Sequence, residues 1–448
     1  MTRLSLRSVV LAALSGGAWL LLPAGQAHAE RLCVKWEIRT EDSGMGIQAG
    51  PNAGGTEDKY AGANAGATAS ALGVRVRISR PGWAQTYDTA PGSGCVDWSD
   101  SSWSGDYDVR VYGYQTDAND NVVRIHDSQS DSCAVAPGAT YSLLIQDYTP
   151  SGGTDVMKVG DEIGRWTTQA MLGYGLYRYH DGVHDKTIHA GFDEGNGDGQ
   201  CNSSAHDGTL NSFITSGRHC VQYSDCAADD DRRKKFLVGH EFGHALTALH
   251  YGDKAGATNG DEPGADSGWL GITDDNSCAN SSVYDITDVE WSSIAFREGF
   301  AHFVSAKIFN DREKSASTGL YEGAFHWGGS HSQDLQRPNR GQVSASDNRY
   351  DDLCCASTSG CGTGTGVIGD WMRFLWDWYA NEGFLGSCTQ QPTKLNMLWL
   401  YTRTRQEGGL LRNNYFQKLQ DGADAMNLPT CLEDGMLDIH AALNGVDQ

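Results

Sequence analysis

The chain has 448 residues, enough for one large domain or for two, and its 57 acidic residues against 34 basic ones give a net charge of −23. So negative a protein is poorly suited to bind nucleic acid or an anionic membrane surface, and we exclude both as expected partners. The charge balance says little about substrate or oligomeric state.

The first 29 residues have the pattern of a cleavable export signal. Arg3 and Arg7 form a basic start, Val9–Leu22 is an apolar run, and Ala27–Ala29 is a small-x-small cleavage sequence. A single-pass anchor is the alternative, but the run is short for a bilayer span and contains serine and glycine. We expect a secreted or periplasmic protein that starts at Glu30 and has no stable membrane anchor.

All 12 cysteines follow this signal. An even number of cysteines in an exported chain favours six disulfides, and the lack of a C-x-x-C pair argues against a zinc-thiolate site. Local spacing suggests two pairings, Cys220 with Cys226 and Cys388 with Cys431.

Residues 30–150 show an apolar period of two, which is typical of half-buried strands. The clearest strands are Cys33–Thr40, Gly73–Arg80, Tyr107–Gly113 and Val122–His126. Asp117–Asn121 is rich in turn residues and separates the last two. We expect a small antiparallel sandwich here, an accessory domain or a pro-domain without catalytic residues.

Pro150–Thr154 is the expected domain boundary, after which the apolar spacing becomes helical between Ile163 and Tyr177. A strand is expected at Thr187–Phe192. The predicted fold class is therefore α+β, with a β-sandwich-like domain at residues 30–150 and a mainly helical catalytic domain at residues 151–448.

Glu194–Gly199 carries the alternating oxygen donors and the glycine of a calcium-binding loop. No glutamate follows at the twelfth position of that loop, so a polar surface loop is the simpler interpretation and bound Ca²⁺ stays open.

Leu237–Leu246 contains the sequence His240-Glu241-x-x-His244. On a helix the two histidines lie one turn apart on one face and can offer both imidazoles to one metal ion, while Glu241 points at a metal-bound water. Catalytic zinc takes three protein ligands and keeps one position for water. The motif therefore predicts one catalytic Zn²⁺, with His240 and His244 as ligands and Glu241 as general base.

A second helix is expected from a capping box at Thr287-x-x-Glu290 to about Asn310. Apolar residues surround Glu298 on this helix, which predicts a buried carboxylate. Burial of a carboxylate is costly unless the group is paired or binds a metal. Glu298 is therefore the candidate third zinc ligand, and an ion pair with Arg297 is the structural alternative.

The segment from Lys314 to Thr365 is rich in glycine, serine and aspartate. Further helices are expected after it, at Ile368–Asn381, Lys394–Arg405, Leu411–Met426 and Met436–Leu443.

Two families of zinc hydrolase share the H-E-x-x-H motif and differ in the third ligand. Metzincins extend it to H-E-x-x-H-x-x-G-x-x-H; His250 has that spacing, but Thr247 replaces the glycine at which the chain must turn. On an unbroken helix His250 would face away from the metal. Gluzincins take a glutamate from a later helix, and Arg297–Phe303 resembles that helix. The chain thus resembles a gluzincin of thermolysin-like or fungalysin-like type, with a metzincin that uses His250 as the alternative.

The resemblance implies a zinc metallopeptidase that hydrolyses proteins or peptides, with His240, His244 and Glu298 as ligands and Glu241 as base. His302 holds a position where thermolysin-like enzymes often have an aspartate that supports a ligand histidine.

Such enzymes usually add a tyrosine or histidine that stabilises the oxyanion, and the downstream candidates are His326, His331, Tyr350 and Tyr379. An exported binding protein that keeps the scaffold without catalysis is the alternative from another class, and the intact Glu241 argues against it. The sequence does not indicate cleavage specificity.

Overall fold

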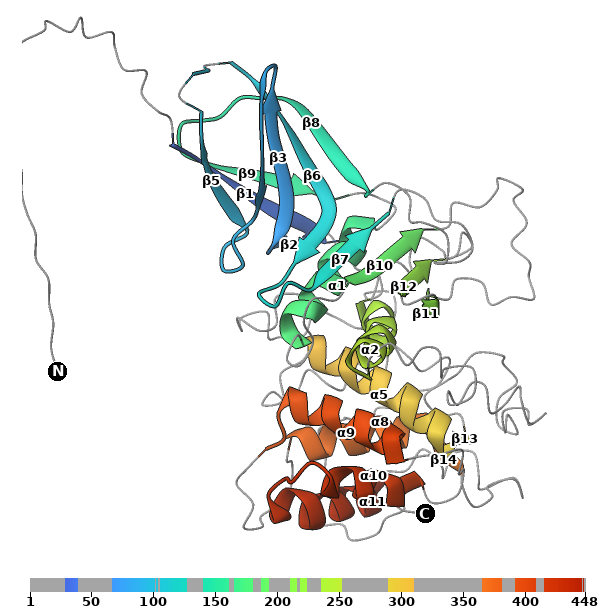
Figure 1. Ribbon diagram of the computed structural model, residues 1–448. Coiled ribbons are helices and arrows are strands. Elements are labelled where there is room, and N and C mark those ends of the chain that lie inside the picture. The colour runs from blue at the N-terminus through green and yellow to red at the C-terminus, as the bar shows by residue number, and fades with distance from the viewer. Residues whose placement is uncertain are drawn as a thin grey trace, which may run out of the picture.

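The computed structural model describes residues 29–38, 67–100, 102–103, 105–126, 140–160, 165–179, 187–192, 210–215, 218–223, 235–251, 289–309, 365–380, 391–407, 415–444 and 446. Within these ranges a β-rich part from the first third of the chain stands above a stack of helices (Figure 1). The chain contains both sheets and helices, which agrees with the predicted α+β class.

Two sheets build the β-rich part. The strands before residue 160 are β1 (Ala29–Ile38), β2 (Ala67–Ser70), β3 (Val74–Arg80), β4 (Trp83–Asp88), β5 (Cys95–Ser99), β6 (Tyr107–Thr116), β7 (Val122–Ile125), β8 (Ser142–Tyr148) and β9 (Thr154–Val159). β1, β2, β5 and β9 form a four-stranded sheet, and the others belong to an eight-stranded sheet. Apolar side chains from the inner faces of both sheets form one core between them.

The alternating residues lie as the sequence predicts. Every second residue of β6 is buried, and its other residues are half-buried. The turn expected at Asp117–Asn121 forms because the Asp117 carboxylate accepts hydrogen bonds from the backbone N–H groups of Asn119 and Asn121. Cys33 on β1 and Cys95 on β5 form a disulfide.

The other cysteine predictions are only partly covered by the described residues. Within the described part of the chain no cysteine is free, and Cys431 takes part in a disulfide. The side chains of its expected partner Cys388 and of the expected pair Cys220 and Cys226 lie outside the described residues, as does the expected export signal up to residue 28.

The eight-stranded sheet continues past residue 160. β10 (Thr187–Phe192), which has the predicted bounds, pairs parallel with β7 and with β12 (Arg218–Tyr223). β11 (Leu210–Thr215) pairs antiparallel with β12 at the end of the sheet. Since β9 also pairs with β1, hydrogen bonds cross the boundary expected at Pro150–Thr154 in both sheets. The division into two domains at residue 150 stays a prediction.

Helix α1 (Arg165–Tyr179) connects the sheets with the helices. Trp166 at its start stacks on Trp36 of β1 with ring centroids 5.6 Å apart. One turn further, Gln169 Nε2 donates a hydrogen bond of 3.2 Å to Gln115 Oε1 of β6. On its other side α1 packs against α2 and α5, so the sheet and the helices share one buried core.

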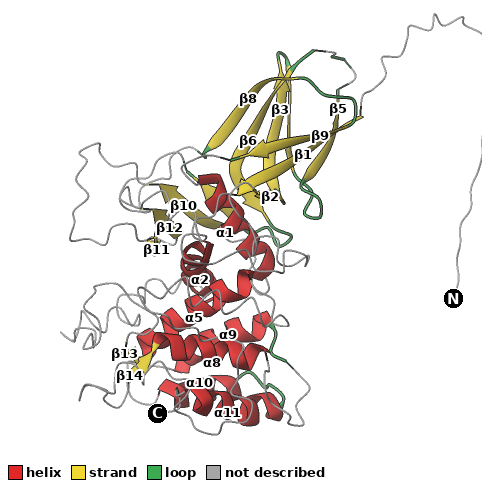
Figure 2. Cartoon of the chain, turned by 180° about the vertical axis from the view of Figure 1, so that it is seen from behind, coloured by secondary structure: helices red, strands yellow, loops and turns green. Residues whose placement is uncertain are grey.

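The remaining helices lie in successive layers, and both views show this stack (Figures 1 and 2). They are α2 (Lys235–Tyr251), α5 (Ser292–Phe309), α8 (Ile368–Ala380), α9 (Lys394–Glu407), α10 (Tyr415–Asp424) and α11 (Leu437–Asn444), the last preceded by a π-helical turn, η5 (Cys431–Met436). α5 lies between α2 and α8, and α11 packs on the other side of α8. Each helix predicted from the sequence is present, and none in the described part of the chain is long and apolar enough to span a membrane.

The start of α5 differs from the prediction. The expected capping box placed Glu290 in the first helical turn, but Val289–Trp291 forms a short strand, β13, that pairs antiparallel with β14 (Thr365–Val367). The backbone groups of these residues bond across this pair, so the helix begins only at Ser292.

Candidate metal centre

Two helices supply the groups of the candidate site. α2 carries His240, Glu241 and His244, and α5 carries Glu298. His240 and His244 lie one turn apart, so their rings share the face of α2 that is turned to α5. Glu298 and Glu241 are only 4% and 7% exposed. Carboxylates so deeply buried need strong partners.

The ligand atoms form a small triangle. His240 Nε2 and His244 Nε2 are 3.2 Å apart, and Glu298 Oε2 is 3.0 Å from the His244 nitrogen and 3.3 Å from the His240 nitrogen. Four ligands arranged tetrahedrally at usual zinc–nitrogen lengths are about 3.3 Å from one another. The three atoms therefore fit around one metal ion. Within the described residues no other group of three or more His, Cys, Asp or Glu side chains has such an arrangement.

A glycine inside the motif allows the two helices to approach this closely. A Cβ atom on Gly243 would lie 2.8 Å from the Cα and 2.9 Å from the carbonyl oxygen of Ala301 on α5. Contacts this short with backbone atoms cannot be relieved by turning a side chain. Gly243 thus sets the separation at which Glu298 reaches the two histidines.

Burial and charge act in opposite directions on the Glu298 carboxyl. Burial by itself raises its pKa, but the charges of His244 and Arg297 and the hydrogen bonds with both imidazoles outweigh burial and hold the pKa well below its usual range. Glu298 is therefore ionised, as a metal ligand must be.

The two histidines respond differently to the same surroundings. Burial lowers the pKa of His240 and keeps its ring neutral. Burial also lowers the pKa of His244, but the Glu298 carboxylate outweighs it, and the pKa of His244 is raised. A cation between them would displace any proton from His244, because a metal binds the neutral imidazole.

Glu241 and His302 complete the immediate surroundings. Glu241 Oε1 is 4.0 Å from His240 Nε2, so this carboxylate lies beside the triangle without belonging to it. The ring of His302, one turn after Glu298, packs on the ring of His240 with centroids 4.1 Å apart. Burial lowers the pKa of His302 strongly, so it is neutral. His302 holds the position at which thermolysin-like enzymes often have an aspartate, and here its contact with His240 is made by the ring.

The two oxygens of Glu298 have different partners. Oε2 faces the histidines, whereas Oε1 accepts hydrogen bonds from Arg297 Nε at 3.0 Å and Arg297 Nη2 at 2.7 Å. From the sequence, the ion pair with Arg297 and the approach to the histidines are alternatives for Glu298. The structure has both at once.

Of the other candidate residues, only the Tyr379 side chain and the backbone at His250 are described. α2 continues without a break through Thr247 to Tyr251, so the turn that His250 would need is absent; the His250 side chain lies outside the described residues. Tyr379 is buried between Phe303 and Trp376, and its ring lies 5.2 Å from the Lys307 ammonium. That part of α5 is two turns beyond Glu298, which argues against an oxyanion role for Tyr379. The remaining candidates, His326, His331, Tyr350 and the calcium loop Glu194–Gly199, lie outside the described residues.

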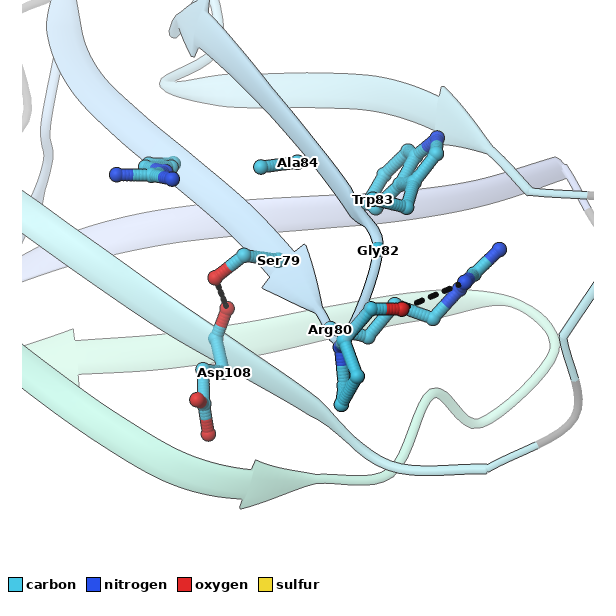
Figure 3. Close-up of a pocket in the computed structure, with 8 residues that line it drawn as sticks. Ser79, Arg80, Gly82, Trp83, Ala84 and Asp108 are labelled. Carbon is cyan, nitrogen blue, oxygen red and sulfur yellow. Dashed lines mark hydrogen bonds between the residues drawn. The ribbon is translucent and has the colours of Figure 1, made fainter.

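Away from this cluster, a cleft lies on the β3–β4 hairpin (Figure 3). This cleft of about 490 Å³ is lined by Arg77, Ser79, Arg80, Pro81, Gly82, Trp83, Ala84 and Asp108. Ser79 Oγ donates a hydrogen bond to the backbone carbonyl of Asp108, and Arg80 donates one to that of Pro81 and another to the Asp100 carboxylate. Because Asp108 is the one carboxylate in the lining and no histidine or cysteine is present, the cleft offers no metal-binding set.

Comparison of the chain with protein-family models, with curated proteins and with solved structures finds no match. The cluster of His240, Glu241, His244 and Glu298 is therefore the basis for a functional assignment.

Proposed function

We propose that this chain is an exported zinc metallopeptidase of gluzincin type. The observation that carries the proposal is the convergence of His240, His244 and Glu298 in one buried triangle, with Glu241 beside it. Two imidazoles and one carboxylate are a donor set that suits zinc, and three protein ligands leave a position for water. A purely structural zinc site would close with a fourth protein ligand.

The proposed reaction needs one proton carrier, and Glu241 is that group. Bound zinc would supply a Lewis acid that polarises the scissile carbonyl and lowers the pKa of a coordinated water. Glu241 accepts a proton from the attacking water and then passes it to the nitrogen of the leaving amine, so each cleaved peptide bond consumes one water. His302, buried and neutral against His240, helps to exclude bulk water from this side of the site.

The sheet edge beside α2 supports a peptide as substrate. Among the described strands β11 is the last in the eight-stranded sheet, with β12 on one side. α2 packs against both of these strands. An extended peptide that adds by backbone hydrogen bonds to the side of β11 where no described strand lies would run along the helix that carries His240 and Glu241.

Two further observations support export. The first 29 residues have the composition of a cleavable signal, and a disulfide such as Cys33–Cys95 is typical of an oxidising compartment. In this proposal residues 30–150 are a β-sandwich-like accessory domain or pro-domain, and residues 151–448 carry the catalysis.

The test is hydrolysis by the purified protein and by its Glu241→Gln variant. In casein or gelatin zymograms the wild type should cleave, a chelator should abolish cleavage, and added zinc should restore it. Glu241→Gln should lose activity by about 10²–10⁴-fold or more, since it removes only the proton acceptor. Its metal content should stay at about one zinc per chain, as three intact ligands require.

Glu37→Gln is the matched control, because it makes the same chemical change on β1 and should retain activity. A zinc-loaded wild type that cleaves no substrate would favour the alternative, an exported binding protein on the same scaffold. Full activity in Glu241→Gln would remove the proposed mechanism.

A further inference from the structure

The two oxygens of the Glu298 carboxylate have different partners, and Arg297 holds one of them. Its Oε2 approaches both histidine nitrogens, and its Oε1 is occupied by two N–H groups of one guanidinium. A carboxylate left to itself can bind a cation through either oxygen or through both. In the structure only Oε2 faces the histidine nitrogens, because Oε1 accepts the hydrogen bonds of Arg297.

We propose that Arg297 is a positioning residue: by holding Glu298 Oε1 it leaves only Oε2 for the metal and so fixes the third ligand as monodentate. This inference rests on the metal-binding part of the proposed function and needs no hydrolysis.

Helix geometry alone does not bring the Arg297 guanidinium to the Glu298 carboxylate. Neighbouring residues on a helix do not face each other, so the Arg297 side chain has to turn along the helix surface to reach the carboxylate of the next residue. Ordering a long arginine side chain costs conformational entropy. Two N–H groups nevertheless converge on the same oxygen, at 2.7 and 3.0 Å. Charge-assisted bonds of this kind restrict both the position and the rotation of a carboxylate.

Burial makes this restraint effective. The side chains of Arg297 and Glu298 are 19% and 5% exposed, so water competes little for either partner. Supporting hydrogen bonds to metal ligands typically change metal affinity by about 10- to 100-fold when they are removed. An effect of this size is expected here.

A purely electrostatic role for Arg297 predicts the opposite sign. A guanidinium near the site repels an incoming cation, so removing its charge should tighten metal binding if charge is all that matters. If orientation matters, removing the arginine should weaken metal binding. The direction of the change therefore separates the two roles.

The experiment uses Arg297→Gln and Arg297→Lys in the full chain. Zinc affinity is measured by competition with a chromophoric chelator, and the coordination number is followed through the visible d–d bands of the Co²⁺-substituted protein. Arg297→Gln should bind zinc about 10- to 100-fold more weakly. Its Co²⁺ bands should lose intensity, because the freed Oε1 raises the coordination number. Arg297→Lys keeps the charge but not the two-pronged contact, so it should show the same changes to a smaller extent.

Arg80→Gln is the matched control. It breaks a part-buried ion pair of the same length, Arg80 Nε to Asp100 Oδ2 at 2.7 Å, in the β-rich part of the chain. It should leave zinc affinity and the Co²⁺ bands unchanged.

Unchanged or tighter zinc binding in Arg297→Gln would overturn the proposal, as would weaker binding with an unchanged Co²⁺ spectrum. If Arg297→Gln does not fold, Arg297→Lys decides by the same two criteria. A wild type that binds neither zinc nor Co²⁺ would instead refute the proposed metal centre itself.

Discussion

Glu298 and His250 compete for the third ligand position, and zinc content distinguishes them. Glu298→Ala should lose zinc as severely as His244→Ala, because each variant removes one of the three atoms that lie 3.0 to 3.3 Å apart. His250→Ala should keep its zinc, because α2 is unbroken at Thr247 and the helix directs position 250 away from His244. Metal analysis of the three purified variants at one fixed free-zinc concentration gives the answer.

The same samples also test the ion-pair interpretation of Glu298. If this carboxylate serves Arg297 alone, Glu298→Ala should be less stable and still carry zinc. A metal-free His250→Ala beside a zinc-loaded Glu298→Ala would contradict the assignment made here and favour the metzincin alternative.

Local spacing and burial were enough to predict most of the site. His240, Glu241 and His244 follow from one helical turn, and Glu298 follows from a carboxylate among apolar residues. The simultaneous contacts of Glu298 could not be predicted, because a spacing of one residue gives no reason for Arg297 to reach its neighbour. Only the three-dimensional structure separates the roles of the two oxygens.

At the scale of elements, the contact between α2 and α5 depends on Gly243. A methyl group there would meet the backbone of Ala301 at 2.8 Å, so Gly243→Ala must push the helices apart. Alanine favours a helix over glycine by about 1 kcal/mol, but overpacking of this kind costs about 1–3 kcal/mol. We expect lower stability and a larger loss of zinc affinity, since Glu298 moves away with α5. Urea denaturation of the metal-free protein and chelator competition measure the two effects separately.

Gly175→Ala on α1 is the control for this variant. Its added methyl group would meet only the ends of side chains, Ile308 Cδ1 and the Phe242 ring, at 3.2 Å. These side chains can yield by a few tenths of an ångström, so zinc affinity should stay near that of the wild type. Equal zinc affinity in Gly243→Ala and Gly175→Ala would show that helix separation does not position Glu298.

The strands with the clearest apolar alternation were predicted, whereas the exposed β4 and the short, partly buried β5 were not. Buried residues alternate with half-buried or exposed ones in β3 and with half-buried ones in β6, and both sequences show the period directly. β4 is exposed or half-buried along its whole length, so no apolar period marks it. The residues of β13 were expected to start a helix. Their strand conformation depends on pairing with β14, which lies more than seventy residues later in the chain, so no local pattern reveals it.

At the scale of the whole molecule, both sheets join segments that were expected to belong to two domains. β7 pairs with β10, and β9 returns to pair with β1. Parallel pairing between distant segments leaves no local trace in a sequence, whereas the change from a period of two to a helical period is visible at once. The apolar period therefore shows where the helices begin but does not show how far the sheet extends.

A buried histidine on α11 makes the stability of the whole fold depend on pH. His440 on α11 is fully buried, and burial lowers its pKa to about 4. The same imidazole in the unfolded chain has a pKa of about 6.5. Between these values the unfolded state binds a proton that the folded state does not. The free energy of unfolding should therefore fall as the pH drops from about 6.5 to about 4. Below about pH 4, His440 should cause no further decrease. The difference corresponds to about 3 kcal/mol.

His440→Gln isolates this contribution, because glutamine is polar, of similar size and does not titrate in this range. Urea unfolding at several pH values between 4 and 7 should give a shallower pH dependence for the variant than for the wild type, and the two curves should run parallel above pH 7. Other buried histidines, such as His302, act equally on both proteins and cancel in the difference. Curves that stay parallel over the whole range would mean that His440 takes up its proton in the folded state, and that α11 opens to admit water before the rest of the molecule unfolds.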